Sequence, residues 1–219
     1  MIEGLIIWLD AEFITGLADG DKIATWPDRL GNYDATQVTD AKRPLYRPSV
    51  RAGRPALQFG GGQFMGIPQV LGNAAASALS IFVVALNTGS TGALVSTRVS
   101  TDGWTLRYNT TVQLAYFHVG KTPNITKTIL NQTNILGFVR NGLDIYVLDQ
   151  YNVGAPSWTT TSGFVVSGIS QTLVGAEDNG TGSFLTGYIY ELLVFGRAVN
   201  PIERDGIVNY LQSKYFTGV

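Results

Sequence analysis

Short apolar runs separated by turn residues recur along this 219-residue sequence, and they favour a fold built on sheets. The clearest pair is Leu136–Arg140 and Leu143–Val147, which flank Asn141 and Gly142. Asn-Gly between two apolar runs is the strongest short signal of a β-hairpin, because a type I′ turn needs positive φ at both central residues. The 26 glycines and the charged content of only 14% suit a fold with many tight turns and little surface helix.

Other runs predict single strands and indicate how deeply they are buried. Leu79–Leu86 is apolar and rich in β-branched residues, which is typical of a strand buried on both faces. Trp104–Tyr108 alternates between apolar and polar residues, so Trp104 and Tyr108 are expected to share one face. Four further strands are predicted at Ile6–Leu9, Ala56–Phe59, Leu173–Gly175 and Tyr188–Phe195.

The C-terminal segment has the pattern of a helix. Asn200 is a favourable N-cap, Pro201 fits the first helical position, and Glu203 can complete a capping box with Asn200. The apolar residues that follow recur at helical spacing. We therefore expect a helix over about residues 201–214, docked on the sheets.

Composition excludes several kinds of site. The chain has no cysteine and a single histidine, His118, so neither a thiolate metal site nor a zinc site built on several histidines is available. The N-terminal segment lacks the basic stretch of a signal peptide. The longest apolar stretch, Ala74–Leu86, is shorter than the roughly 20 residues of a membrane span. We expect a protein made in a cytoplasm, without insertion into a membrane.

Charge is unevenly placed along a chain whose formal net charge is −1. Residues 1–40 hold eight acidic and two basic residues, whereas residues 41–101 hold six basic residues and no acidic one. A nucleic-acid patch is one interpretation of the basic segment. The alternative, which a pI near 5.8 favours, is that the two segments lie side by side and neutralise each other, with no nucleic acid bound.

Several segments occur in an order that carries a family resemblance. They are Leu5–Ala11, Thr25–Ala35, Arg43-Pro44, Gly53–Phe59, Val139–Gly142, Leu173–Ala176, Gly187–Phe195, Pro201–Arg204 and Tyr210–Tyr215. In this order they resemble concanavalin A-like domains of the laminin G-like type, of the kind found in lectin-like modules and phage virion proteins. The resemblance implies one all-β domain over residues 1–219, a two-sheet antiparallel jelly-roll sandwich with a short C-terminal helix. It implies no single function, because its members include lectins, glycan-binding modules, glycoside hydrolases and structural parts of phage tails and heads.

The residues that glycoside hydrolysis needs are not in the pattern of this fold. Glucanases of the fold carry their carboxylates on one strand as Glu-x-Asp-x-x-Glu, and no such triplet occurs here. Glu191 is the only acidic residue in a predicted late strand, and we expect it to be buried and paired with an arginine. The sequence has no Gly-x-Ser-x-Gly motif that His118 could serve as a base. We predict that the chain is not an enzyme and requires no cofactor.

A calcium site stays open as an option. Laminin G-like domains often hold Ca²⁺ at a loop rim, and short acidic loops supply the oxygens that calcium prefers. Asp178, Glu177 and Asn179 are the preferred candidate ligands, because their loop joins two predicted strands at an end of the sandwich. Asp19 and Asp21 are a second choice. All of these are ordinary turn residues too, so plain turns are the alternative.

Carbohydrate binding needs exposed aromatic faces beside amide or carboxylate groups. The candidate ligand-binding residues are Trp158, Tyr151, Asn152, Trp104 and Asp102. Trp158 and Tyr151 lie in Gln150–Ser162, whose Thr, Ser, Gly and Pro residues are typical of a loop. Core packing is the alternative role for Trp104.

The preferred functional hypothesis is a non-catalytic virion structural or attachment protein. Such a capsid decoration, head fibre or tail component would form a homo-oligomer, contact other virion proteins and bind host-surface glycans. The hypothesis depends on the resemblance and on the lack of an export signal. The alternative is a lectin-like carbohydrate-binding module of a bacterial surface or secreted protein. An unusual glycoside hydrolase is a third hypothesis, and it would need Glu191.

Overall fold

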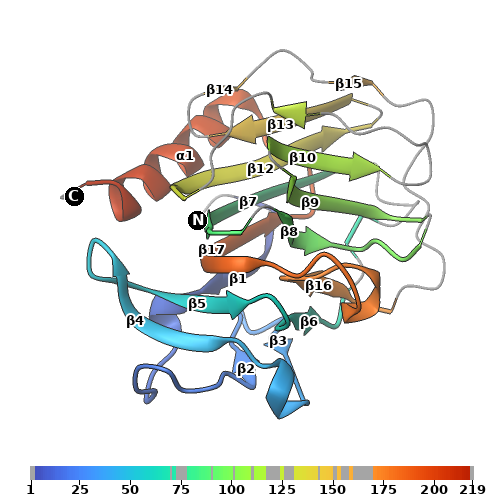
Figure 1. Ribbon diagram of the computed structural model, residues 1–219. Coiled ribbons are helices and arrows are strands. Elements are labelled where there is room, and N and C mark those ends of the chain that lie inside the picture. Colours follow the sequence, from blue (N-terminus) through green and yellow to red (C-terminus); the bar gives the residue numbers. More distant parts are fainter. Residues whose placement is uncertain are drawn as a thin grey trace.

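The structure is a computed structural model that describes residues 3–69, 71–72, 78–89, 91–100, 102–109, 111–116, 124–125, 131–142, 144–149, 152–153, 158–159 and 170–217. Two antiparallel sheets pack face to face, and helix α1 (Pro201–Tyr215) lies on the outer face of the first sheet (Figure 1). The predicted all-β sandwich with a C-terminal helix is confirmed. No helix in the described ranges is long and apolar enough to cross a membrane.

The first sheet has nine strands within the described residues. Its central strand β17 pairs with β7 along one edge, and with β5 and then β1 along the other. The order is β14 (Asn152–Val153), β13 (Asp144–Asp149), β12 (Thr133–Asn141), β7 (Ala78–Asn87), β17 (Thr186–Phe195), β5 (Arg54–Gly60) and β4 (Leu45–Arg51), with β1 (Leu5–Asp10) beside β17 and β15 (Trp158–Thr159) beside β13.

The second sheet has eight strands in the same described part of the chain. Their order is β11 (Asn124–Ile125), β10 (Thr111–Tyr116), β9 (Trp104–Asn109), β8 (Thr91–Ser96), β16 (Thr172–Val174), β6 (Met65–Ile67), β3 (Ala35–Thr36) and β2 (Thr25–Trp26). In the described ranges, three short 3-10 helices occur in loops, at Ala11–Phe13, Asp40–Lys42 and Asp178–Gly180.

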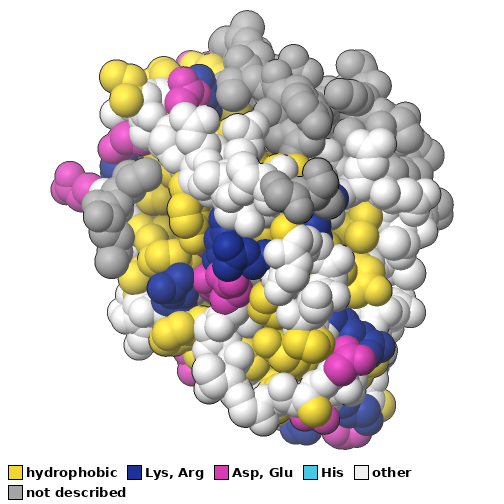
Figure 2. Space-filling view, turned by 90° about the vertical axis from the view of Figure 1, so that its left-hand side faces the viewer, with side chains coloured by type: hydrophobic (Ala, Val, Ile, Leu, Met, Phe, Trp, Pro, Cys, Tyr) yellow, Lys and Arg dark blue, Asp and Glu magenta, His cyan; other side chains and the backbone are white. Residues whose placement is uncertain are grey.

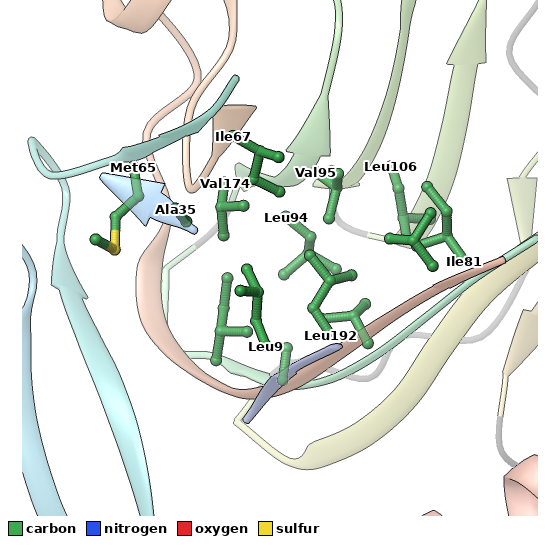
Figure 3. Close-up of a cluster of buried hydrophobic side chains, with 14 of the residues drawn as sticks. Leu9, Ala35, Met65, Ile67, Ile81, Leu94, Val95, Leu106, Val174 and Leu192 are labelled. Atoms are coloured by element: carbon green, nitrogen blue, oxygen red, sulfur yellow. The ribbon is translucent and has the colours of Figure 1, made fainter. Parts of the chain in front are cut away.

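The main hydrophobic core fills the space between the two sheets. Figure 3 shows aliphatic side chains from both sheets pointing toward one another, among them Leu9, Ile81 and Leu192 from the first sheet and Leu94, Leu106 and Val174 from the second. Trp104 is fully buried in this core, with its ring centroid 5.2 Å from that of Phe138. Apolar area removed from water in this way is the main favourable contribution to folding.

Strand β7 is buried on both faces, as its continuous apolar run predicts. Ile81 and Val83 belong to the core between the sheets. Phe82 and Val84 belong to a second core, which lies between the first sheet and α1. The strand therefore joins three layers: the second sheet, the first sheet and the helix.

A β-bulge in β17 changes which way its side chains point. The register with β7 shifts between Ile189 and Glu191, so Tyr190 is an extra residue in the strand. Ile189 and Leu192 lie in the core between the sheets, whereas Tyr190 packs in the helix-side core. Glu191 also faces the helix, because its carboxylate contacts Lys214 of α1. Strict alternation from Ile189 would instead direct this carboxylate into the apolar space between the sheets.

Strands β12 and β13 form the predicted hairpin, but the turn comes one residue later than predicted. Asn141 pairs with Asp144, so Asn141 belongs to the strand and the turn follows it. Gly142 has a φ of 61°, a conformation that glycine adopts without steric cost. Moving the turn by one residue moves the pairing by two residues, which leaves every side chain on its original face. The apolar alternation therefore could not distinguish the two registers.

Ion pairs join the oppositely charged N-terminal segments, in agreement with the prediction that they lie side by side. Arg47 Nη1 lies 3.0 Å from Asp19 Oδ1, and Arg54 pairs with Glu12. On the face that Figure 2 shows, acidic and basic side chains touch between hydrophobic patches. Exposed pairs of this kind contribute little to stability individually. Arg43 also pairs with Asp40, whereas Arg98 pairs outside the acidic segment, with Glu177 and Asp178.

Candidate functional site

The structure brings four predicted site residues to one end of the second sheet: Asp102, Glu177, Asp178 and Asn179. Asp102 closes the turn between β8 and β9, and the other three form the short helical turn after β16. The two loops are joined by hydrogen bonds. The amide of Asp178 donates to the carbonyl of Arg98 at 3.1 Å, and the amide of Ser100 donates to Asp178 Oδ1 at 2.8 Å.

Arginine side chains occupy the space between these acidic residues. Arg98 Nη1 lies 2.5 Å from Glu177 Oε2 and 3.0 Å from Asp178 Oδ2, and Arg107 Nη1 lies 3.7 Å from Glu177 Oε1. Glu177 has no exposed surface, so its charge requires such partners. Among the described residues, no group of three or more His, Cys, Asp or Glu could hold a metal ion. Calcium binding by Asp178, Glu177 and Asn179 stays a prediction.

Trp104 and Trp158, the predicted aromatic residues within the described ranges, belong to different sheets. Trp104 has no exposed surface, and its indole Nε1 donates to the carbonyl of Leu71 at 3.0 Å, so it offers no ring face to a sugar. Asn152 and Trp158 belong to β14 and β15, which pair with β13 in the other sheet. Tyr151 lies outside the described residues, as does His118.

A groove that the sequence did not reveal lies on the outer face of the first sheet, beside the start of α1. Its volume is about 290 Å³, close to the lower end of small-ligand pockets. It is lined by the directly paired residues Val139 and Tyr146 of β12 and β13, by Asn141, by the connector Ala198–Pro201 and by Arg204. The lining comes from two segments that are far apart in the sequence, residues 139–146 and 198–204.

Buried hydrogen bonds hold the connector in place. Ser80 of β7, which pairs with Val139, donates its hydroxyl to the carbonyl of Arg197 at 2.8 Å and accepts from the amide of Val199 at 3.0 Å. The predicted capping box is present as well, with reciprocal bonds between Asn200 and Glu203. These contacts fix the wall of the groove before any ligand arrives, which reduces the entropy cost of binding.

The groove combines an apolar lining with polar groups that have few partners. Within the described residues, the Tyr146 hydroxyl and the Asn141 side-chain amide make no hydrogen bond, and the Arg204 guanidinium bonds only to Asp205. Aromatic and apolar surface with a few convergent polar groups is typical of sites for small polar molecules. The described lining contains no Asp or Glu, so it lacks the carboxylates that hydrolysis of a glycosidic bond would need.

Glu191 is held by four side chains and is not accessible. Trp8 Nε1 and the Tyr210 hydroxyl donate to its Oε1 at 2.7 and 3.0 Å. The Tyr215 hydroxyl donates to Oε2 at 2.8 Å, and Lys214 Nζ lies 2.9 Å from the same oxygen. The prediction of a buried, paired Glu191 is confirmed, but the prediction of an arginine partner is wrong. A lysine on α1 can reach β17, so the ion pair attaches the helix to the sheet.

Burial is the largest single influence on the pKa values of Glu191 and Lys214 in this network. Burial, together with the charge of Asp10, raises the pKa of Glu191. Burial alone would lower the pKa of Lys214, but the carboxylates of Glu191 and Asp10 outweigh it and raise that pKa. Lys214 Nζ also lies 2.9 Å from Asp10 Oδ2 and 3.1 Å from Glu12 Oε2. One ammonium group thus contacts three carboxylates, and Arg29 and Arg54 supply further positive charge to Asp10 and Glu12.

A second groove, of about 230 Å³, lies next to this network but lacks polar groups. It is lined by Leu5, Trp8, Leu193, Phe195, Gly206, Ile207 and Tyr210. The polar atoms of Trp8 and Tyr210 turn inward to Glu191, so the rings present apolar surface to the groove. Without hydrogen-bonding groups it suits a sugar less well than the groove at Tyr146 does.

No protein-family model and no curated protein sequence matches the chain. Its fold is similar to a sialidase from Trypanosoma rangeli, with a TM-score of 0.67 and 14% identity over 98% of this chain. It is also similar to domain 4 of an extracellular arabinanase from Geobacillus stearothermophilus, solved in complex with arabinotriose, with a TM-score of 0.63 and 15% identity over 87% of this chain. The binding domain of botulinum neurotoxin serotype D has a TM-score of 0.66 and 11% identity over 95% of this chain.

These similarities differ in how much of the other protein they include. The chain spans 33% of the sialidase and 51% of the toxin binding domain, but the whole of the arabinanase domain. At such low identity they show the β-sandwich fold and no more than that.

Proposed function

We propose that this chain is a non-catalytic carbohydrate-binding domain and that the groove at Tyr146 holds the sugar. The observation that carries the proposal is the meeting of Tyr146, the Asn141 amide and the Arg204 guanidinium over an apolar lining. A tyrosine ring can pack against the apolar face of a sugar while its hydroxyl bonds to the sugar's hydroxyls. The arabinanase domain, which this chain matches along that domain's whole length and which is described in complex with arabinotriose, supports a sugar as the ligand class.

The proposal predicts a loss of affinity when the tyrosine ring is removed. A glycan array identifies ligands, and isothermal titration calorimetry then measures affinity for the native chain and for Tyr146→Ala. Loss of one ring contact of about 1.4 kcal/mol corresponds to about tenfold weaker binding. Tyr188→Ala is the matched control, since Tyr188 packs on the same outer face of the sheet but does not line the groove. No binding to any glycan, or equal losses in both variants, would refute the proposal.

A finer proposal is that sugar binding serves attachment of a virion to its host, as a capsid decoration, head fibre or tail component. Its support is the family resemblance of the ordered sequence segments. The alternative is a lectin-like module of a bacterial surface or secreted protein. Light scattering with and without calcium, followed by pull-down with capsid and tail proteins, separates the two. A calcium-indifferent monomer without affinity for those proteins would refute the virion role and leave the sugar-binding groove in place.

A further inference from the structure

The charge of the groove at Tyr146 distinguishes it from a site for neutral sugars. Arg204 is the one charged side chain among its described lining residues. Its side chain lines the groove and is 19% exposed, so it is partly shielded from water. A charge in such a place interacts more strongly with a ligand than a fully hydrated charge does.

The carboxylates nearest in sequence do not satisfy this arginine. Glu203 is engaged elsewhere, because its two oxygens accept from Arg197 at 2.5 and 2.8 Å and one of them also accepts from the amide of Asn200. Asp205 is 60% exposed and bonds to Nε and Nη2 of Arg204 through a single oxygen. An exposed pair of this kind contributes little and can rearrange.

We infer that the groove selects a saccharide that carries a carboxylate over a neutral saccharide of the same size; this rests on the proposed sugar-binding function. A planar guanidinium binds a carboxylate through two parallel N–H groups, which fixes the sugar's orientation as well as its charge. Arg204 Nη1 has no hydrogen bond within the described residues and can supply one of them. The side-chain amide of Asn141, which also lines the groove, adds a further donor. The amino end of α1, which borders the groove, adds partial positive charge.

The test is a matched pair of ligands on the full chain. One is a disaccharide that contains a uronic acid, and the other is the same disaccharide with its carboxylate reduced to the alcohol. We expect calorimetry at low salt to show at least tenfold tighter binding of the acid, and a smaller ratio at high salt because ions screen the attraction. Arg204→Gln is expected to bring the ratio close to one. Arg204→Lys, which keeps the charge but loses the planar fork, is expected to give an intermediate ratio.

Arg47→Gln is the matched control, because Arg47 also pairs with an exposed aspartate but lies away from the groove. Circular dichroism and the melting temperature show whether each variant is folded. Equal affinities for the two sugars in the native chain, or an unchanged ratio in folded Arg204→Gln, would overturn the inference while sugar binding itself stands. If neither sugar binds and the glycan array shows no bound glycan, both the proposed function and the inference are refuted.

Discussion

Replacing Lys214 with methionine tests how the buried network under α1 contributes to stability. Methionine keeps an unbranched apolar stem, so the substitution removes mainly the charge. Lys214 Nζ lies 2.9 Å from both Asp10 Oδ2 and Glu191 Oε2. Asp10 keeps Arg29 as a partner at 2.8 Å, whereas Glu191 keeps only uncharged donors such as Trp8. The variant therefore leaves one buried carboxylate without a counter-charge.

The size of the effect follows from what Glu191 can do instead. Removing one partner of a buried ion pair costs about 3–5 kcal/mol. The loss has a ceiling here, because Glu191 can bind a proton rather than stay charged. Between its ordinary pKa of 4.5 and pH 7, protonation costs about 1.4 kcal/mol per pH unit, or about 3.4 kcal/mol in total. We expect Lys214→Met to lower the free energy of unfolding by about 3 kcal/mol at pH 7.

The loss in the free energy of unfolding is expected to be smaller at acidic pH. Without Lys214, burial raises the folded-state pKa of Glu191 further above its unfolded value. A group of this kind contributes stability below its unfolded pKa, and that contribution is lost as the pH rises through the folded pKa. At pH 5 the ceiling is about 0.7 kcal/mol, so the difference between variant and native chain is expected to fall below about 1 kcal/mol.

Urea unfolding, followed by tryptophan fluorescence at pH 7 and pH 5, measures both quantities. The control is the double variant Lys214→Met with Glu191→Gln, which removes both charges. It is expected to recover most of the lost stability at pH 7 and to lose the extra pH dependence. A loss below about 1 kcal/mol at pH 7, or the same loss at both pH values, would show that the ion pair does not stabilise the helix contact.

Three further substitutions probe local features by the same unfolding assay. Gly206→Ala is expected to raise the free energy of unfolding by about 0.5–1 kcal/mol, because Gly206 is inside α1 and an added Cβ would meet no atom of another segment within 4 Å. No gain would argue against an unstrained helix there. Gly137→Ala is expected to lower the free energy of unfolding by at least about 2 kcal/mol, because the added Cβ would lie 1.9 Å from the carbonyl oxygen of Ile81. An unchanged stability would contradict the close contact between the strands. Asn200→Ala is expected to cost about 1 kcal/mol through the lost capping box, whereas Asn200→Ser should retain most of it.

Much of the fold could be predicted from the sequence, because its signals are local. The apolar run at 79–86 indicated a strand buried on both faces, and Asn200 with Glu203 indicated where the helix begins. The hairpin at Asn141 was predicted as an element, but its register was not, since both registers bury the same faces. The partner of Glu191 was missed because a bulge at Tyr190, which no pattern in the strand announces, turns the carboxylate toward the helix.

The candidate site could not be predicted in the same way. Asn141, Tyr146 and Arg204 come from a hairpin and a helix, and nothing in their local sequence distinguishes them from surface residues. One clue was available: the capping box fixes the start of α1, and a helix start that borders a sheet is a place where a groove can form. By contrast, the acidic loop at Glu177 and Asp178 follows a strand, as its sequence position indicated, but its partner Arg98 lies about 80 residues away and could not be identified from the local sequence.

The place of β17 between β7 and β1 has a consequence for the kinetics of folding. Trp8 of β1 contacts Glu191 of β17 across 183 residues of chain, and β7 gains its second neighbour only when β17 is added. Contacts of such long range make folding slow, on the order of milliseconds to seconds. Until a ribosome has synthesised residue 195, the edge of the apolar strand β7 that will pair with β17 has no partner. Its backbone groups are then open to pairing with other chains. Aggregation during synthesis, rather than instability of the finished domain, is therefore the hazard that this topology creates.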